Sequence, residues 1–228
     1  MRKSIWTLLV LAFLLVVPSS TAWAKASKAE ADQEVTDSGL TLDHFVNDPD
    51  MGWFRDHAKD AKGLFICHQI VKAGFIFGGS GGRCVLVVKG EKGWHGPAFY
   101  TIGTASAGFQ AGVQSSELIG LVMTQKAVDS LMSNAFKMGG DASVAAGPVG
   151  IGTAGTPNAD IISYSRSKGV YGGVDVSGSS IKPSEDYNEA HYGKAASPID
   201  IIVRGSVHSK QAGPALISKI QKLYAGKK

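Results

Sequence analysis

The segment from Gly74 to Trp94 constrains the fold more than any other part of the chain. Two apolar runs flank a cluster of glycines with the sequence Gly78-Gly-Ser-Gly-Gly82. Glycine clusters mark tight turns, and runs of apolar and β-branched residues are typical of strands. The segment therefore predicts a strand, a turn centred on Ser80 and a second strand. Because the turn holds no lysine or histidine, its glycines indicate an architectural role.

Glycine is also abundant elsewhere, with 29 residues in 228, which is roughly twice the usual share. Three pairs of glycines lie four residues apart, and positions four apart on one strand point to the same face. We therefore expect three strands with a bare face, which permits sharp coiling or the close approach of another element. The pairs are Gly74 with Gly78, Gly108 with Gly112, and Gly169 with Gly173.

Helical patterns are expected near both ends of the chain. Apolar residues recur at helical spacing from Ser38. Asp48-Pro49 offers a capping residue and a first-turn proline for an amphipathic helix over 48–62. A third helix is expected over 124–136, with Thr124 as its N-cap, and Gly213-Pro214 opens a last one.

The residues between these helices predict mainly strands. Short apolar runs separated by glycine or turn residues are typical of strands, whereas the polar stretch 182–196 is expected to be a loop. The fold class is therefore α+β: a strongly curved, mostly antiparallel, glycine-rich sheet or a small barrel, closed by a few helices. The expected strands are 75–77, 85–88, 98–104, 108–113, 118–123, 142–149, 161–164, 170–176 and 199–203.

The first 24 residues have the pattern of a cleavable signal peptide. Arg2 and Lys3 precede an apolar run over 5–17, and Ala22-Trp-Ala24 places small residues at the two positions that a signal peptidase reads. We expect cleavage after Ala24 and export to the periplasm or cell envelope. Residues 25–37 are then a polar leader, and 38–228 form one domain.

Charge and cysteine content narrow the function classes further. Without Arg2 and Lys3 the formal net charge falls from +4 to +2, which does not indicate nucleic-acid binding. Cys67 and Cys84 could form a disulfide in an exported protein. A turn centred on Ser80 would instead place Cys84 opposite a residue near Ile76, which favours two buried thiols.

Two sequences match catalytic or cofactor motifs only superficially. Gly78–Gly82 fits the G-x-S-x-G pattern of a hydrolase elbow, but that elbow requires a helix after Ser80, and here a strand is expected. Gly150–Gly155 fits a dinucleotide fingerprint, but Pro157 follows where the helix should be running. We expect neither a catalytic serine nor a bound nucleotide.

Potential metal ligands and catalytic carboxylates are likewise not arranged for chemistry. The six histidines lack the i, i+4 spacing of a zinc helix. Cys67, His68 and Cys84 could supply three ligands, but neighbours on a strand point to opposite faces. The acidic residues beside glycine or alanine are expected to serve in turns or caps; they are Asp141, Asp160 and Asp175. We expect no catalytic residue, metal or cofactor.

Several linked motifs occur in order along the chain. They are 61–64, the glycine hairpin 72–88, Gly93-Trp94, 96–100, 108–114, 141–150, 162–170, Asn188 and Tyr192-Gly193. Together they cover about residues 40–205 and resemble the SYLF family of lipid-binding domains. The chain departs from the family pattern at His68, where a proline is common, and at Cys84, where glycine is usual.

The resemblance implies a non-enzymatic domain that binds anionic phospholipid, here phosphatidylglycerol or cardiolipin. The expected binding residues are Trp53 and Phe54 on the amphipathic helix, with the basic residues Lys59, Lys62 and Lys72 beside it. Two alternatives remain open. The same apolar face could pack on the sheet, and the protein could be an envelope scaffold that binds a protein partner without lipid.

Overall fold

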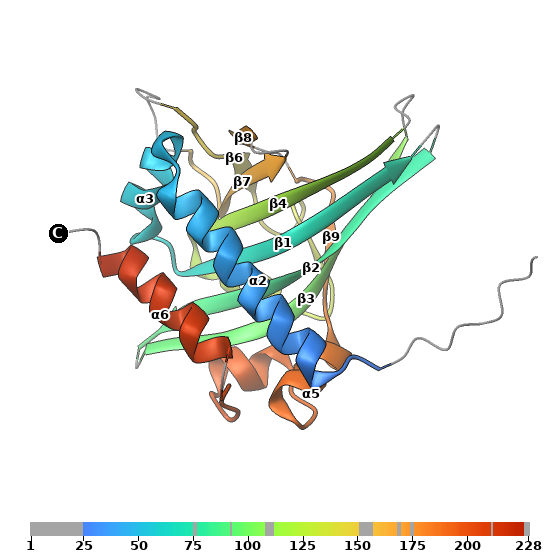
Figure 1. Ribbon diagram of the computed structural model, residues 1–228, viewed down its shortest axis with the longest axis vertical. Coiled ribbons are helices and arrows are strands. Elements are labelled where there is room, and N and C mark those ends of the chain that lie inside the picture. The colour runs from blue at the N-terminus through green and yellow to red at the C-terminus, as the bar shows by residue number, and fades with distance from the viewer. Residues whose placement is uncertain are drawn as a thin grey trace, which may run out of the picture.

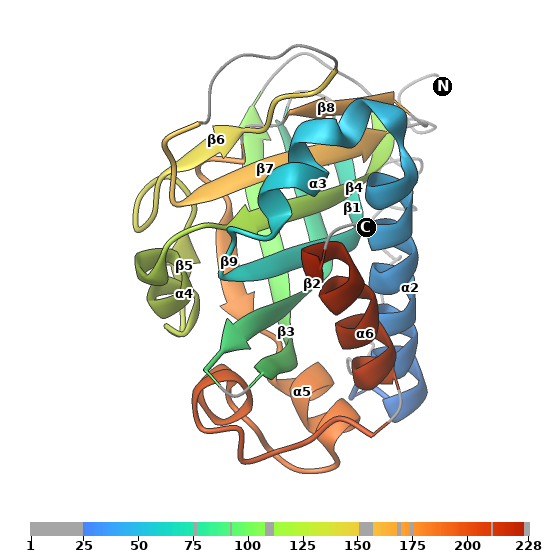
Figure 2. The same cartoon turned by 90° about the vertical axis from the view of Figure 1, so that its left-hand side faces the viewer.

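The fold is a single curved β-sheet with helices packed against it. The computed structural model describes residues 25–74, 77–91, 93–107, 112–150, 157–167, 170–173, 176–210 and 212–225. The sheet curls into a half-barrel, with the largest helices on its outer face (Figures 1 and 2). This confirms the predicted α+β class with a strongly curved, mostly antiparallel sheet.

The strands follow the order β5-β9-β3-β2-β1-β4-β7-β6, and β8 pairs with β7. Among the described residues, every pairing between these strands is antiparallel except that of β6 with β7. The long strands β1 to β4 therefore form the centre, and short strands continue the curl on both sides. The bounds are β1 Gly63–Gly74, β2 Phe77–Gly90, β3 Gly93–Ala107, β4 Gly112–Val122, β5 Phe136–Lys137, β6 Val144–Ala146, β7 Ile161–Ser167, β8 Val170–Gly173 and β9 Ser180–Pro183.

The helices cover the two faces unequally. Helices α2, α3, α5 and α6 contribute to the apolar core on the outer face, whereas α4 and the π-helical turn η2 contribute to the core on the inner face. Within the described part of the chain, no helix has the length and hydropathy needed to cross a bilayer. The bounds are α2 Lys28–Asn47, η1 Pro49–Met51, α3 Gly52–Ala58, α4 Gln125–Leu131, α5 Glu185–Tyr192, η2 Ile199–Val203 and α6 Ala212–Ala225.

Helix α2 differs from the prediction because it begins ten residues earlier than expected. Ser27 and Glu30 form a capping box at its N-terminus, and Ala31 and Val35 are buried in the outer core. Residues 28–37 are thus part of the domain's first helix and do not form a separate leader. Because these residues are mostly polar, their composition does not indicate the apolar stripe that α2 packs against the sheet.

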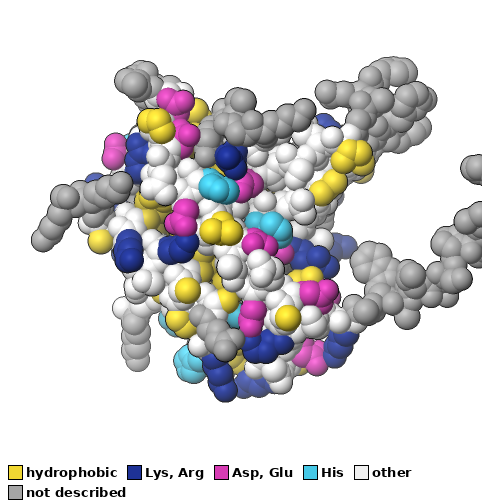
Figure 3. Space-filling model, viewed as in Figure 1, with side chains coloured by type: hydrophobic (Ala, Val, Ile, Leu, Met, Phe, Trp, Pro, Cys, Tyr) yellow, Lys and Arg dark blue, Asp and Glu magenta, His cyan; other side chains and the backbone are white. Residues whose placement is uncertain are grey.

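Histidine–carboxylate contacts also hold α2 in place. Glu34 on α2 lies 2.9 Å from His68 on β1, and His44 on α2 lies 2.8 Å from Glu117 on β4. Histidine and acidic side chains accordingly lie side by side along this face of the molecule (Figure 3). On the other side of α2, Asp43 pairs with Lys219 of α6.

The glycine-rich hairpin turns earlier than predicted. Strands β1 and β2 pair from Gly63 opposite Val88 to Gly74 opposite Gly78, so the cluster Gly78–Gly82 lies within β2 and not in a turn around Ser80. This shift, with a bulge in β1 between Ile66 and Gln69, brings two positions together that the predicted register separated.

Those two positions are the cysteines. Cys67 and Cys84 are fully buried and joined by a disulfide, with an S–S distance of 2.06 Å. The expectation of two free thiols was therefore wrong, because it depended on the wrong turn position.

The prediction from glycine spacing was also wrong in detail. Gly74 and Gly78 lie on different strands and face each other across the hairpin, and Gly74 also pairs with Gly112 of β4. Gly108 and Gly169 lie outside the described residues. Gly74, Gly78 and Gly112 hence gather at neighbouring strand ends, and the pair Gly74 and Gly78 does not leave one face of a single strand bare.

Two further segments, one expected to be a loop and one expected to be a strand, are helical. The expected loop 182–196 contains α5, which Gly193 ends in the left-handed conformation with φ of 73°. The expected strand 199–203 is the π-helical turn η2. Ser197 and Asp200 exchange hydrogen bonds there as a capping box, with Pro198 at the first helical position.

The helix predicted at Gly213-Pro214 is confirmed as α6. The helix predicted over 124–136 is confirmed as far as Leu131, but Phe136 lies in β5. The Thr124 side chain accepts a hydrogen bond from the Ala127 backbone and caps α4. Helix α6 lies over the outer face of the sheet beside α2 (Figure 2).

Candidate functional site

The inner face of the sheet changes character along the strands. Near the disulfide it is apolar and packs against α4 and η2. Farther along β1 to β4, inward positions carry Lys72, Ser80, Thr104 and Gln114 instead of apolar residues. Because these positions alternate with outward ones along each strand, the distal half of the inner face presents a polar surface, which borders the apolar Ile70, Ile102 and Leu118.

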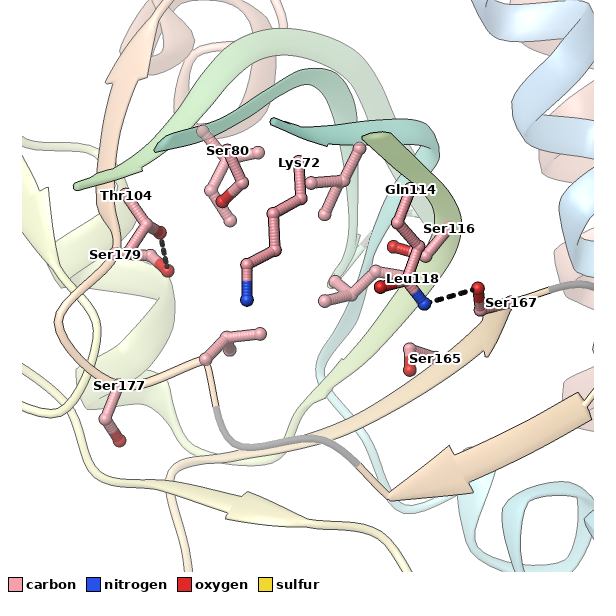
Figure 4. A pocket seen from close by; sticks show the side chains of 13 residues that line it. Lys72, Ser80, Thr104, Gln114, Ser116, Leu118, Ser165, Ser167, Ser177 and Ser179 are labelled. Carbon is pink, nitrogen blue, oxygen red and sulfur yellow. Dashed lines mark hydrogen bonds between the residues drawn. The ribbon is translucent and has the colours of Figure 1, made fainter. Parts of the chain in front are cut away.

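This polar surface encloses a cavity of about 310 Å³, which we call the inner cavity (Figure 4). Strands β1, β2, β3, β4 and β7 contribute to its wall, together with the segment leading into β9. Its lining residues are Ile70, Lys72, Ser80, Ile102, Thr104, Gln114, Ser116, Leu118, Ser165, Ser167, Val176, Ser177 and Ser179.

Lys72 points into the middle of the inner cavity (Figure 4). Among the lining residues that the structure describes, it is the only charged one. Hydrogen bonds fix parts of the wall: Thr104 to Ser179 at 2.7 Å, and Gln114 to Ser167 at 2.8 Å. The cavity thus combines one ammonium group with fixed hydroxyl groups and an amide.

A second concave site lies on the outside of the domain between α2, α3 and α6, and we call it the outer groove. Its apolar lining includes Val46 and Tyr224. Four cationic and two acidic side chains also line it, so its charge is positive overall; they are Arg55, Lys59, Lys219 and Lys222, with Asp43 and Asp56.

Half of this positive charge is engaged within the protein. Arg55 donates to backbone carbonyls of Val46 and Asp48, and Lys219 pairs with Asp43. Lys59 and Lys222 are exposed on the groove. These two lysines are therefore the groups best placed to meet an external anion.

Two more exposed lysines extend the positive edge around Tyr224. The Tyr224 hydroxyl donates to the Ala61 carbonyl, next to Lys62, and the Lys89 ammonium lies 5.7 Å from the Tyr224 ring centroid. Burial raises the pKa of the Tyr224 hydroxyl above its usual value. We refer to Lys59, Lys62, Lys89 and Lys222 as the lysine cluster.

The structure distributes the predicted lipid-binding residues over three environments. Lys59 and Lys62 belong to the lysine cluster, whereas Lys72 lies in the inner cavity. Phe54 is fully buried, with its ring 5.5 Å from that of Tyr164. Trp53 is half-buried and stacks on His57 with 3.9 Å between ring centroids. The five side chains therefore do not form one surface.

The catalytic and cofactor motifs considered in the sequence have structural explanations at the residues that the structure describes. Ser80 lies inside β2 with strand on both sides, so it does not stand on a strand-to-helix elbow. Residues 151–155 of the dinucleotide-like motif and Asp175 lie outside the described residues. Among the residues the structure describes, no group of three or more histidine, cysteine or acidic side chains could hold a metal ion.

Asp141 and Asp160 have the structural roles expected of them. Asp141 accepts a hydrogen bond from the Lys137 backbone. Asp160 accepts hydrogen bonds from Thr124 and from the backbone and side chain of Ser143. The bond from Thr124 is the largest influence that holds the pKa of Asp160 well below its usual value. Asp141 fixes the turn after β5, and Asp160, directly before β7, joins that strand to the N-cap of α4 and to Ser143 before β6.

Comparison with known proteins shows the family. Residues 103–223 match the family described as "Ysc84: Las17-binding protein actin regulator". The chain belongs to this family. The match confirms the resemblance to SYLF domains and covers more than half of the chain.

Individual relatives are eukaryotic and longer than the matched region. The chain is similar to "LAS seventeen-binding protein 3" of Saccharomyces cerevisiae, with 36% identity over 60% of this chain and 32% of the relative. It is also similar to "SH3 domain-containing YSC84-like protein 1" of Homo sapiens, with 28% identity over 67% of this chain and 46% of the relative. The matches thus span one third to one half of these relatives. No solved structure matches the chain.

Two residues of the family pattern have clear structural roles. Asn188 on α5 bonds both backbone groups of Phe99, accepting from its N–H at 3.0 Å and donating to its carbonyl at 3.3 Å. Tyr192 donates to the Pro97 carbonyl at 2.9 Å. Together they attach α5 to β3, which explains why a polar segment folds as a helix there.

Proposed function

We propose that the protein is a non-enzymatic binding domain that associates with anionic phospholipid surfaces through the outer groove and the lysine cluster. The observation that carries the proposal is the combination of an apolar groove lining with exposed Lys59 and Lys222 on the same groove. Anionic amphiphiles have matching parts: a charged headgroup for the lysines and an apolar body for the groove.

The lysine cluster supplies the electrostatic part of this association. Each lysine near an anionic membrane surface contributes roughly 1 kcal/mol, and the contribution falls off within a Debye length. Lys62 and Lys89 lie on the edge next to Tyr224, so they can approach the same surface as Lys59 and Lys222. Binding should therefore be strong at low salt and weak at high salt.

The apolar part differs from an amphipathic helix lying in a membrane. Phe54 and Ala58 on α3 are packed in the outer core, so this face of α3 stabilises the domain. Val46 and Tyr224 line the groove and provide apolar contact without unfolding α3. In this proposal Trp53 and Phe54 hold α3 in position, and the lysines make the contact.

We further propose that the protein acts in the cell envelope after removal of residues 1–24. The signal-peptide pattern supports this location. The buried disulfide between Cys67 and Cys84 is consistent with it, because disulfides persist in oxidising compartments. N-terminal sequencing of protein from an envelope fraction should give Lys25 as the first residue; an intact Met1 there would contradict cleavage.

Vesicle co-sedimentation tests the lipid proposal. The purified protein is mixed with vesicles of phosphatidylglycerol and phosphatidylcholine, or of phosphatidylcholine alone, at low and high salt. We expect sedimentation only with the anionic vesicles, and at least a tenfold weaker apparent affinity after Lys59→Gln combined with Lys222→Gln, from two lost contributions of about 1 kcal/mol each.

The matched control replaces two exposed lysines on β5 and β9, Lys137→Gln and Lys182→Gln. It removes the same charge and should leave vesicle binding nearly unchanged. Equal loss in both variants would mean that net charge, not the groove, governs binding. Absence of binding to anionic vesicles at low salt would reject the proposal and favour the alternative of a scaffold that binds a protein partner.

A further inference from the structure

We propose that the inner cavity is a second binding site, for a small polyhydroxylated carboxylate of the sugar-acid class. The cavity lies on the inner face of the sheet, and its lining shares no residue with the outer groove. The inference does not depend on lipid binding.

The charge of the ligand follows from Lys72. Its ammonium group points into the cavity, and none of the lining residues in the described part of the chain is acidic (Figure 4). No ion pair of Lys72 occurs among those found for the described residues. A single ammonium balances one negative charge, which a carboxylate carries, whereas a phosphate monoester carries close to two at neutral pH.

The polar side chains of the cavity wall indicate which other groups the ligand carries. Seven of the lining residues are serine or threonine, and Gln114 adds an amide. Hydroxyl groups both donate and accept hydrogen bonds, so they suit a ligand that carries hydroxyl groups of its own. An acyl chain in the same space would remove these groups from water without replacing their hydrogen bonds, at a cost for each group.

The floor and the volume are consistent with a compact ligand. Ile70, Ile102 and Leu118 provide aliphatic contact at the base, where the C–H face of a sugar acid can rest. A volume of about 310 Å³ lies at the small end of the range for ligand pockets. The site is thus sized for one small molecule.

Nuclear magnetic resonance titration of the purified protein tests this assignment. The probes are gluconate, the neutral polyol sorbitol, and glucose 6-phosphate. We expect gluconate to shift the amide signals of Lys72, Ser80 and Ser116 in a saturable manner, with sorbitol at least tenfold weaker and glucose 6-phosphate weaker than gluconate.

Substitutions separate a specific site from general charge attraction. Lys72→Gln should weaken gluconate binding by at least tenfold, whereas Lys72→Arg, which keeps the charge, should largely retain it. Lys59→Gln in the outer groove serves as the matched control and should leave gluconate binding unchanged while it weakens vesicle binding. Because Lys72 is exposed at the distal part of β1, all three variants should keep the melting temperature.

Several results would overturn the proposal. Equal binding of sorbitol and gluconate, or full binding by Lys72→Gln, would show that the ammonium group does not select the ligand. Tighter binding of glucose 6-phosphate would show that the site prefers a dianion. Absence of any saturable shift with gluconate would show that the cavity does not bind this class.

Discussion

At the scale of single residues, adjacent positions in the glycine cluster differ in whether they can accommodate a side chain. A Cβ atom on Gly82 would lie 2.2 Å from the Gln69 carbonyl oxygen, at the bulge of β1. A Cβ atom on Gly81 would have its nearest neighbour, the Ile102 carbonyl oxygen, at 3.6 Å, an ordinary contact. The bulge therefore explains why one of these glycines is needed and its neighbour is not.

We predict that Gly82→Ala destabilises the domain by several kcal/mol, because backbone atoms must move to admit the methyl group. Gly81→Ala is the matched control and should change the free energy of unfolding by less than about 0.5 kcal/mol. Urea denaturation of both variants measures the difference. Equal stability of the two variants would contradict the position of the bulge.

The role of a single residue could be predicted from the sequence where it depends on residues nearby in the chain. Thr124 as an N-cap and the turn role of Asp141 could be predicted because each depends on near neighbours. The partners of Asp160, Thr124 and Ser143, are distant in the sequence and could not be named from it. The disulfide could not be predicted, because it depends on the register between β1 and β2. An error in the position of one turn was enough to separate Cys67 from Cys84.

At the scale of elements, α2 is attached to the sheet by contacts that titrate. The side-chain hydrogen bond to buried Glu34 is the main cause of a raised pKa of His68, and the charges of Glu34, Asp37 and Glu117 add to it. Protonated His68 therefore stabilises the folded state. This contribution is fully present below the unfolded pKa, near 6.5, and is lost as pH rises through the higher folded pKa.

We predict that His68→Gln destabilises the domain by about 1 kcal/mol near pH 6 and by clearly less at pH 9, where the wild-type protein has lost the charged histidine. Denaturation at both pH values measures this difference. His208→Gln changes an exposed histidine and should have a small effect at both. A larger effect of His68→Gln at pH 9 than at pH 6 would contradict the ion pair with Glu34.

Elements with a strong apolar pattern could be predicted from the sequence, whereas polar elements could not. The apolar face of α6 and the β-branched run of β2 are strong periodic signals. By contrast α5 and the first turns of α2 are polar, and their stability comes from tertiary contacts such as Asn188 with Phe99. The turn η2 was mistaken for a strand because its isoleucines are β-branched.

At the scale of the whole molecule, the central strands are covered unevenly along their length. Residues 84–88 of β2 are buried between the outer and inner cores. The distal part of the same hairpin is more exposed, as at Val71, Lys72 and Gly81. The domain thus has a strongly packed part and a more open part on the same strands.

We predict that amide hydrogen exchange follows this division, because local stability depends on buried contacts. Amides of 70–73 and 79–82 should exchange much faster than those of 64–67 and 84–88, although all belong to paired strands. Exchange measured by mass spectrometry on short peptides tests this. Equal protection along the hairpin would show that the distal part is as stable as the core.

The sequence predicted the class of the molecule better than its sites. The curved sheet and the family were correct, because glycine content and linked motifs run through most of the chain. The inner cavity was missed, although Gln114, Ser116 and Leu118 alternate on β4 with a period of two. Two long-range properties were needed to find it: the pairing of β4 with β7, which places Leu118 beside Ser165, and the curl of the strands around the cavity (Figure 4).

The change from an apolar to a polar inner face has a consequence for how such a domain can diversify. Residues such as Lys72, Ser80 and Gln114 line the cavity but take no part in either apolar cluster. Exchanging them alters what the protein recognises at little thermodynamic expense, while the packed ends of the same strands preserve the architecture. Ligand specificity can therefore change between proteins that share an ancestor while their fold stays the same.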